Sequence, residues 1–303
     1  MAPPAADYEI DAALVSRLLR AQFPAIGDLP LTLLDSGFDN VMFRLGDELL
    51  VRLPRRAVAL ELVQNEQRWL PELAVQLPLP VPVPLHVGVP MFGYPSSFSV
   101  LPWLAGSSAD LGYSDSDQAE VLGQFLRALH SHSHAGAAAP ENAVRGVPLA
   151  ARDTVVIQRL ERLQALPGVK LPFTAIWQLW RAGLAAPVAS ESVWLHGDLH
   201  ARNVLVQDGK LAAVIDWGDL TVGDAATDLA SFWMLFADAT ARADGLASYG
   251  AAPALVARAK GWACSFATLL LDSSLADDGT VEHQGHCQMG YATFANLFAP
   301  DLF

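Results

Sequence analysis

Residues 192–219, SVWLHGDLHARNVLVQDGKLAAVIDWGD, are the stretch of the sequence that decides the fold. Short apolar runs at 193–195, 204–206 and 211–215 have the aliphatic and β-branched character of strands. The last two runs are joined by Gln207-Asp208-Gly209-Lys210, and an Asp-Gly pair between such runs is typical of a tight turn. The sequence therefore predicts a β-hairpin that follows a first, separate strand.

Polar residues stand at the ends of these predicted strands, where a buried strand end would be apolar. They are His196, Asp198 and Asn203 on one side and Asp216 on the other. Carboxylate and carboxamide oxygens on adjoining strand ends can converge on Mg²⁺, which prefers oxygen ligands and leaves room for phosphate oxygens. A carboxylate that the metal does not need could take the proton of an attacking hydroxyl. The combination indicates phosphoryl transfer.

The motif His196-Gly197-Asp198-Leu199-His200-Ala201-Arg202-Asn203, followed by Ile215-Asp216-Trp217-Gly218, resembles the aminoglycoside phosphotransferase family. The resemblance implies an α+β, two-lobed protein-kinase-like fold, with a small N-terminal antiparallel sheet lobe and a larger, mainly helical C-terminal lobe. It also implies transfer of the γ-phosphate of ATP or GTP to a hydroxyl of a small molecule. Asp198 would then be the catalytic base, and Asn203 and Asp216 the Mg²⁺ ligands. His200 would stand in the position of the catalytic-loop lysine of kinases, within reach of the transferring phosphate.

The residues before the motif fit the N-terminal lobe of such a fold, with strands predicted at 31–34, 41–45 and 49–53. In the turn after the first strand, the resemblance implies that Ser36 and Gly37 cover the nucleotide phosphates. Arg52 stands where the family usually has the strand lysine that holds these phosphates. Glu66, on a helix predicted at 58–73, matches the glutamate that pairs with this cation, and Glu61 is the competing candidate.

A hinge between the two lobes is expected at 102–106, after a strand at 98–101. The resemblance implies that Leu101 and Trp103 face the base of the nucleotide. The domain boundaries that follow are 1–104 for the nucleotide-binding lobe and 105–303 for the catalytic and acceptor-binding lobe.

The C-terminal lobe is expected to be mainly helical, with helices near 116–131, 153–166, 173–186, 230–239 and 253–271. The histidines His130, His132 and His134 are interpreted as a solvated loop at a helix end, and residues 282–287 as a loop and not a zinc site. Asp224 is expected to cap a helix, and Asp228 to brace the catalytic loop.

Composition narrows the class of protein further. The net charge of −13 argues against a nucleic-acid partner, because phosphate binding needs a basic face. No apolar run approaches the roughly 18 residues of a membrane span, and no secretory signal is recognisable. Two cysteines make no disulfide framework, so reduced thiols in the cytoplasm are expected.

The identity of the acceptor is the least determined feature of the sequence. Residues 191–303 contain 14 Asp and Glu against 5 Lys and Arg, a net −9, which favours a cationic, aminoglycoside-like acceptor. A macrolide phosphotransferase is an alternative, suggested by Val51-Arg52-Leu53-Pro54-Arg55. A metabolic small-molecule kinase of the same fold and a nucleotide-binding pseudokinase also stay open.

Overall fold

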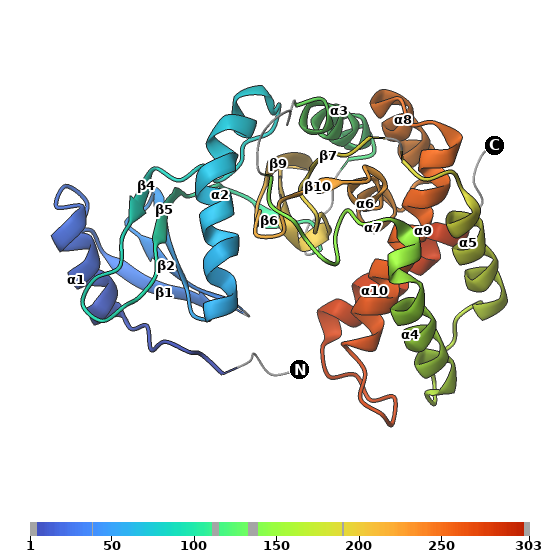
Figure 1. Cartoon of the computed structure of the whole chain (residues 1–303), viewed down its shortest axis with the longest axis horizontal. Helices are drawn as coiled ribbons and strands as arrows, with labels where there is room; N and C mark the ends of the chain where they lie inside the picture. Colours follow the sequence, from blue (N-terminus) through green and yellow to red (C-terminus); the bar gives the residue numbers. More distant parts are fainter. Residues whose placement is uncertain (1–4, 38, 111–114, 133–138, 190, 300–303) are drawn as a thin grey trace.

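The structure is a computed structural model that describes residues 5–37, 39–110, 115–132, 139–189 and 191–299. Figure 1 shows an N-terminal part built around a sheet and a larger, mainly helical remainder, with α2 between them. The predicted α+β architecture, with a small antiparallel sheet in the N-terminal part, is therefore confirmed.

The N-terminal sheet has five antiparallel strands in the order β1-β2-β3-β5-β4. Their bounds are β1 Leu31–Ser36, β2 Asn40–Leu45, β3 Leu49–Pro54, β4 His86–Gly88 and β5 Phe98–Pro102. Side chains of β2 alternate between buried and half-buried positions, as the two-residue period of a strand requires. Helix α1 (Ala12–Gln22), whose first turn is capped by the Asp11 side chain, buries Val15, Leu18 and Leu19 in the same apolar core as the sheet.

Helix α2 (Leu60–Leu73) connects the two parts of the molecule. Its residues Trp69, Leu70 and Leu73 belong to the apolar core of the C-terminal part and not to the core under the sheet. The indole of Trp69 packs on that of Trp194, with ring centroids 5.1 Å apart. The short 3₁₀ helices η1 (Ala57–Ala59) and η2 (Ala74–Gln76) flank α2.

The C-terminal part combines eight helices of the described chain with two small sheets. The helices are α3 Gln118–His130, α4 Asp153–Ala165, α5 Phe173–Ala185, α6 Ala226–Leu229, α7 Ser231–Leu235, α8 Ala239–Tyr249, α9 Pro253–Asp272 and α10 Gln284–Phe298. Two further 3₁₀ helices are η3 (Leu149–Arg152) and η4 (Ala201–Asn203). One sheet pairs β7 (Val193–Leu195) with β10 (Thr221–Gly223), and the other orders β6 (Ser107–Ser108), β8 (Val204–Gln207) and β9 (Lys210–Val214) as β6-β8-β9.

The predicted hairpin is β8–β9, and its turn shows why the sequence needs Asp-Gly there. Asp208 and Gly209 both have positive φ, +51° and +77°, which matches the right-handed twist of the strands that they join. The strand at 193–195 is β7, which pairs with β10 and stays separate from the hairpin.

Helix α9 is the centre of the helical part, and α4, α5, α6 and α10 pack on it. By length and composition α9 could cross a membrane, but 67% of its most apolar window is buried inside the protein. This burial is typical of a core helix.

One helix prediction and one loop prediction were wrong, and one helix was not expected. Residues 230–239 are not one helix: α7 ends at Leu235, and α8, which was not expected, begins at Ala239. Residues 282–287, expected as a loop, include the first turn of α10. The helical pattern of α10 is weak because Gly285, Gly290 and other small residues occupy it, and packing against α9 stabilises it instead.

The histidine series after α3 also differs from the expectation of a solvated loop. His130 is the last residue of α3 and is buried, with 7% of its surface exposed. His132 follows the helix, and His134 lies outside the described residues.

The close approach of α10 to α9 predicts opposite effects of alanine at two glycines of α10. A Cβ added at Gly290 would lie 2.6 Å from Leu271 Cγ, whereas no atom lies within 4 Å of a Cβ added at Gly285. Gly290→Ala is expected to lower the free energy of unfolding by about 1–3 kcal/mol, because the buried Leu271 must move. Gly285→Ala is expected to leave it unchanged or raise it by up to about 1 kcal/mol. Denaturant titration of both variants measures the difference, and equal effects would contradict the packing.

Candidate active site

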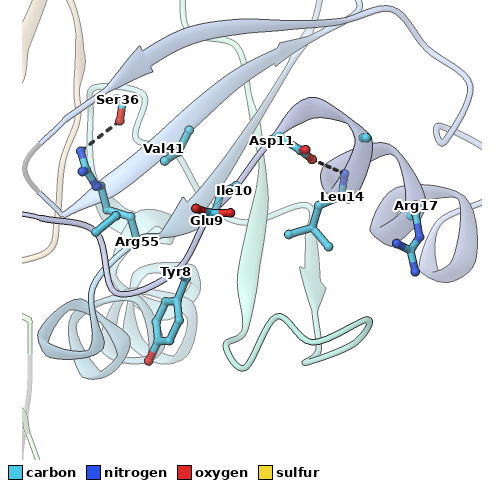
Figure 2. Close-up of a pocket in the computed structure, with 11 residues that line it drawn as sticks. Tyr8, Glu9, Ile10, Asp11, Leu14, Arg17, Ser36, Val41 and Arg55 are labelled. Carbon is cyan, nitrogen blue, oxygen red and sulfur yellow. Dashed lines mark hydrogen bonds between the residues drawn. The ribbon is translucent and has the colours of Figure 1, made fainter.

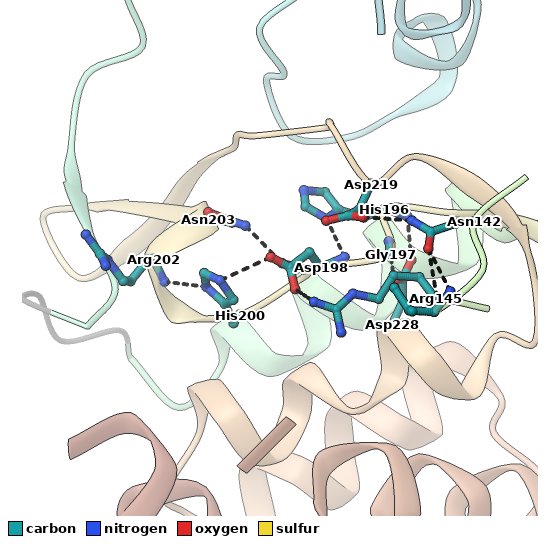
Figure 3. Close-up of polar contacts among 11 residues, drawn as sticks. Asn142, Arg145, His196, Gly197, Asp198, His200, Arg202, Asn203, Asp219 and Asp228 are labelled. Carbon is teal, nitrogen blue, oxygen red and sulfur yellow. Dashed lines mark hydrogen bonds and ion pairs between the residues drawn. The ribbon is translucent and has the colours of Figure 1, made fainter. Parts of the chain in front are cut away.

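The loop at residues 196–203 runs from β7 into η4 and β8, and its backbone is fixed by local hydrogen bonds (Figure 3). The imidazole of His196 is fully buried; its Nδ1 accepts from the Asp198 amide at 3.2 Å, so its Nε2 donates to the Ile215 carbonyl at 3.0 Å. Gly197 has φ +86°, and a Cβ there would lie 2.3 Å from the carbonyl oxygen of Asp219. Only glycine fits this position.

The carboxylate of Asp228 braces the loop, as the sequence predicted. Its oxygens accept from the backbone amides of His196 at 2.8 Å and Gly197 at 2.9 Å. The sequence analysis missed a second layer of this brace, in which His130 Nε2 lies 3.3 Å from Asp228 and His130 Nδ1 lies 2.9 Å from the hydroxyl of Tyr249. Helices α3, α6 and α8 therefore meet at this loop.

Asp224 begins the helix that presents Asp228. Its Oδ1 accepts from the Ala226 amide at 3.1 Å, although Ala225 and not Asp224 is the N-cap residue of α6. Arg258 of α9 binds both of its oxygens, at 2.7 and 3.1 Å, which anchors the start of α6.

Asp198 lies between two cationic or hydrogen-bonding partners (Figure 3). Arg145 Nη2 is 2.6 Å from its Oδ1, and His200 Nε2 is 3.3 Å from its Oδ2. Burial alone opposes ionisation of Asp198, but the charge of Arg145 and the contact with His200 outweigh it and hold the pKa of this carboxyl well below its usual range. Arg145 had no predicted role, because it is 53 residues away in sequence and stands in no motif.

Asp219 is a second carboxylate next to this site that the sequence analysis did not single out. Burial and the charge of Asp198 raise its pKa, while Arg145 and a 2.7 Å hydrogen bond from Asn142 oppose the rise. The two carboxylates, Asp198 and Asp219, therefore differ in their tendency to ionise.

Asn203 and Asp216 stand where β8 begins and β9 ends, and the Ile215 amide donates to the Asn203 carbonyl at 2.9 Å. The amide nitrogen of Asn203 donates to the Asp198 carbonyl at 2.9 Å, which leaves its Oδ1 for a cation. Asp216 has φ +61°, a strained conformation for a residue with a side chain. A carboxylate and an amide oxygen suit Mg²⁺ when phosphate oxygens complete its coordination.

The predicted pair of Arg52 and Glu66 is present in the structure. Arg52 Nη2 lies 2.5 Å from Glu66 Oε1, and both side chains are buried. Burial lowers the pKa of Arg52, but the charges of Glu66 and Asp216 outweigh burial and raise the pKa. Asp216 therefore lies near enough to this pair for its charge to act on Arg52. Arg52 Nε is buried and finds no hydrogen-bond partner among the described residues, which fits a phosphate oxygen at this point. Glu61, the competing candidate, is exposed.

The turn that holds Ser36 and Gly37 is tied to Arg55, at the end of β3. Arg55 Nη1 donates to Ser36 Oγ and to the Gly37 carbonyl, both at 3.0 Å. Figure 2 shows Ser36 and Arg55 lining a pocket together with Tyr8, Glu9 and other residues of the N-terminal segment. No hydrogen bond or ion pair of the described chain joins Ser36 or Gly37 to the loop at 196–203, so the structure does not bring these two predicted sites into contact.

The predicted hinge residues, Leu101 and Trp103, already contact other residues of the N-terminal part. Leu101 is buried in β5, opposite Leu50 of β3. The Trp103 amide donates to the Glu48 carbonyl at 2.7 Å, and the Arg44 guanidinium lies 3.5 Å above the Trp103 ring. The backbone amide of Trp103 is therefore already engaged, and a bound base would have to use other groups of this segment.

Arg202, which stands in the motif between His200 and Asn203, is directed away from Asp198 (Figure 3). It lies 3.7 Å from Asp110 and 3.4 Å from His286, and its side chain is 54% exposed. Within the described part of the chain, no three His, Cys, Asp or Glu side chains form a group that could hold a metal ion. Cys264 and Cys287 are free thiols.

Comparisons with known proteins agree with this geometry. Among solved structures, the chain is similar to aminoglycoside 2'-phosphotransferase-IIIa in its GDP complex, with 16% identity over 94% of this chain and 97% of that one and a TM-score of 0.66. It is also similar to macrolide 2'-phosphotransferase MphH from Brachybacterium faecium, with 25% identity over 95% and 98% of the two chains and a TM-score of 0.60. A third similar structure is macrolide 2'-phosphotransferase type I, with 23% identity over 98% of this chain and 100% of that one and a TM-score of 0.61.

These neighbours have a protein-kinase-like fold, as the sequence predicted. No curated protein sequence matches the chain at a significant level. The model of the phosphotransferase enzyme family APH matches residues 30–262. The chain therefore belongs to the APH phosphotransferase family.

Proposed function

We propose that the protein transfers the γ-phosphate of ATP or GTP to a hydroxyl group of a small molecule, with Mg²⁺ bound by Asn203 and Asp216. The observation that carries this proposal is the convergence of Asp198, Asn203 and Asp216 at the ends of β7, β8 and β9, opposite the buried pair of Arg52 and Glu66. Neighbouring structures that hold GDP and ATP support a nucleotide as donor. Residues 1–104 would form the nucleotide-binding lobe and 105–303 the lobe that binds the acceptor.

In the proposed reaction, the acceptor oxygen forms a bond to the γ-phosphorus while the bond from this phosphorus to the β,γ-bridging oxygen breaks. The nucleoside diphosphate leaves, and the hydroxyl proton passes to the carboxylate of Asp198. Arg52, oriented by Glu66, binds phosphate oxygens, and Ser36 and Gly37 cover them. Leu101 and Trp103 border the base. When bound, Mg²⁺ would neutralise charge on the β- and γ-phosphates.

Asp198 would act as a weak base in this reaction, because Arg145 keeps its pKa low. A weak base is sufficient where the phosphoryl group passes through a loose transition state, since the hydroxyl loses its proton late. The carboxylate then mainly orients the hydroxyl. His200, which donates to Asp198, holds the second carboxylate oxygen and lies close to the path of the phosphate.

For the acceptor, two classes are suggested by similar proteins. Neighbouring structures with kanamycin, streptomycin and gentamicin support the expected cationic, aminoglycoside-like acceptor. The 25% identity to the macrolide phosphotransferase and the strand ending Val51-Arg52-Leu53-Pro54-Arg55 support a macrolide as the second candidate. Nucleotide hydrolysis measured with and without Mg²⁺ separates any of these enzymes from a pseudokinase.

Asp198→Asn is expected to lower kcat by on the order of 10²–10⁴ while nucleotide affinity stays within a few-fold, because Asp198 acts on the acceptor hydroxyl. Steady-state kinetics and nucleotide titration measure the two quantities separately. A variant that keeps most of the wild-type turnover would remove Asp198 from the mechanism.

Asp216→Ala is expected to weaken both nucleotide binding and turnover, and Asn203→Ala to raise the Mg²⁺ concentration needed for half-maximal rate. Higher Mg²⁺ should partly rescue Asn203→Ala, because one ligand of the ion remains. Mg²⁺ titrations of the initial rate make the comparison. If both variants titrate like the wild type, the metal ligands lie elsewhere.

Arg145→Gln is expected to move the acidic limb of the kcat/KM profile to higher pH. Removing the cation destabilises the Asp198 carboxylate, so the group takes up a proton at a higher pH, nearer the ordinary value of about 4. Arg181→Gln, which removes an exposed arginine of α5, is the control and should leave the limb in place. If the pH profile of Arg145→Gln coincides with that of the control variant, Arg145 does not set the pKa of the base.

A further inference from the structure

Asn142 joins two parts of the chain close to the proposed base (Figure 3). Its side-chain amide donates to Asp219 Oδ1 at 2.7 Å. Its own Oδ1 accepts from the backbone amides of Val144 and Arg145, both at 3.0 Å. An asparagine that accepts from the backbone a few residues further on closes a turn. The Asn142 side chain therefore shapes the turn at 142–145 and attaches this turn to Asp219.

The turn ends at Arg145, which is the closer of the two partners of the Asp198 carboxylate. Arg145 Nη2 lies 2.6 Å from Asp198 Oδ1, and the guanidinium lies 4.6 Å from the centroid of the Phe266 ring. The side chains of Arg145 and Asp198 are only 14% and 22% exposed. A short, charge-assisted hydrogen bond is directional. The position of the Arg145 backbone therefore helps to determine how the Asp198 carboxylate is oriented.

The chain on both sides of this turn is anchored to β10 and the residue that follows it. On one side, the Thr221 hydroxyl donates to the Pro140 carbonyl at 2.9 Å. On the other side, the Asp224 amide donates to the Gly146 carbonyl at 2.9 Å. Asn142 lies between these two contacts, so its side chain decides where the intervening turn is placed, while the rest of the segment is held by other bonds.

Asp219 is a firm anchor for Asn142, because its backbone lies directly against the loop that contains Asp198. Gly197 precedes Asp198 in this loop, and a Cβ added at Gly197 would lie 2.3 Å from the Asp219 carbonyl oxygen. The contacts therefore form a closed ring: the loop contacts Asp219, Asp219 binds Asn142, and the turn brings Arg145 back to the loop.

We infer that Asn142 is a positioning residue for the proposed phosphoryl transfer: it places Arg145 so that the guanidinium orients the Asp198 carboxylate toward the acceptor hydroxyl. The inference rests on the proposed function and adds to it a residue that acts through Arg145. A side chain of the same size that cannot donate to Asp219 should misplace the guanidinium and slow the reaction.

Asn142→Asp provides the main test. The variant keeps an oxygen for the two backbone amides but replaces the donor to Asp219 with a second carboxylate. We expect the rate of Mg²⁺-dependent hydrolysis of ATP or GTP, with water as the acceptor, to fall roughly 10- to 100-fold, the effect of one hydrogen bond to a charged group. The affinity for the nucleotide should stay within a few-fold, because the phosphate site at Arg52 is not touched.

Ala143→Asp is the matched control for the added charge. It places a carboxylate at the neighbouring exposed position and leaves the Asn142 side chain in place. The control should hydrolyse nucleotide at the wild-type rate. If it loses as much activity as Asn142→Asp, the added charge and not the hydrogen bond explains the loss, and the inference is wrong.

An exchange of donor and acceptor tests the hydrogen bond itself. In the double variant Asn142→Asp/Asp219→Asn, the carboxamide is on residue 219 and the carboxylate on residue 142, so the bond can form again with the original net charge. The double variant is expected to recover the rate of Asp219→Asn alone to within about threefold. A double variant that is no faster than Asn142→Asp would overturn the inference.

The Arg145→Gln background tests the route of the effect. Once the guanidinium is absent, Asn142→Asp has no cation to misplace and should change the rate by less than about twofold. Equal losses in the wild-type and Arg145→Gln backgrounds would show that Asn142 does not act through Arg145.

Asn142→Ser replaces Asn142→Asp in these tests if the latter does not fold, which a loss of nucleotide affinity would reveal. Its shorter side chain adds no charge and does not reach Asp219, so the same fall in rate is expected. A wild-type rate in a folded Asn142→Ser variant would overturn the inference.

Failure of the proposed function gives a different result from failure of this inference. Absence of Mg²⁺-dependent hydrolysis of either nucleotide by the wild type would refute the proposed function and with it the reaction that Asn142 would serve. Normal hydrolysis by the wild type that folded variants of Asn142 leave unchanged would refute only the positioning role.

Discussion

The geometry of the site depends on the buried carboxylate of Asp228. Its side chain is fully enclosed and accepts from two consecutive backbone amides, those of His196 and Gly197, while His130 lies at hydrogen-bond distance from one of its oxygens. A buried charge that lost these partners would cost several kcal/mol, so the loop has one strongly preferred conformation. Because His130 ends α3 and its partner Tyr249 ends α8, the position of Asp198 depends on how the helices pack.

Helix α2 couples this loop to the strand that holds Arg52. Glu66 and Trp69 are one turn apart on α2; the first binds Arg52 at 2.5 Å, and the second packs on Trp194, two residues before the loop. Residues at this spacing share one face of a helix, so one rigid element sets both contacts. A rotation of α2 would therefore have two effects at the same time: it would separate Arg52 from Glu66, and it would disturb the packing of Trp69 on Trp194 at the start of the loop.

Much of the site was predictable because its signals are local. The Asp-Gly turn and the residues at the strand ends each depend on neighbours within a few positions, and the structure has them as expected. Arg145 and His130 were not predictable in their roles, since each contacts a residue 53 or more positions away. Helix α10 was missed because its glycines lower the helix propensity of the segment. Gly290 has to be small because it contacts Leu271 of another helix, and the local sequence does not show such a tertiary contact.

Net charge of a segment and charge at a site are different quantities. Residues 191–303 are strongly acidic, yet the nearest charged partner of Asp198 comes from outside that segment and is a guanidinium. Coulomb energy falls with distance and with solvent screening, so a half-buried arginine 2.6 Å away outweighs many exposed carboxylates beyond a Debye length of about 8 Å. Arg145 therefore helps to keep the Asp198 carboxylate ionised, with a pKa held below its usual range. Since the fold and the loop determine the reaction while the surrounding side chains determine the substrate, the net charge of the segment does not by itself identify the acceptor.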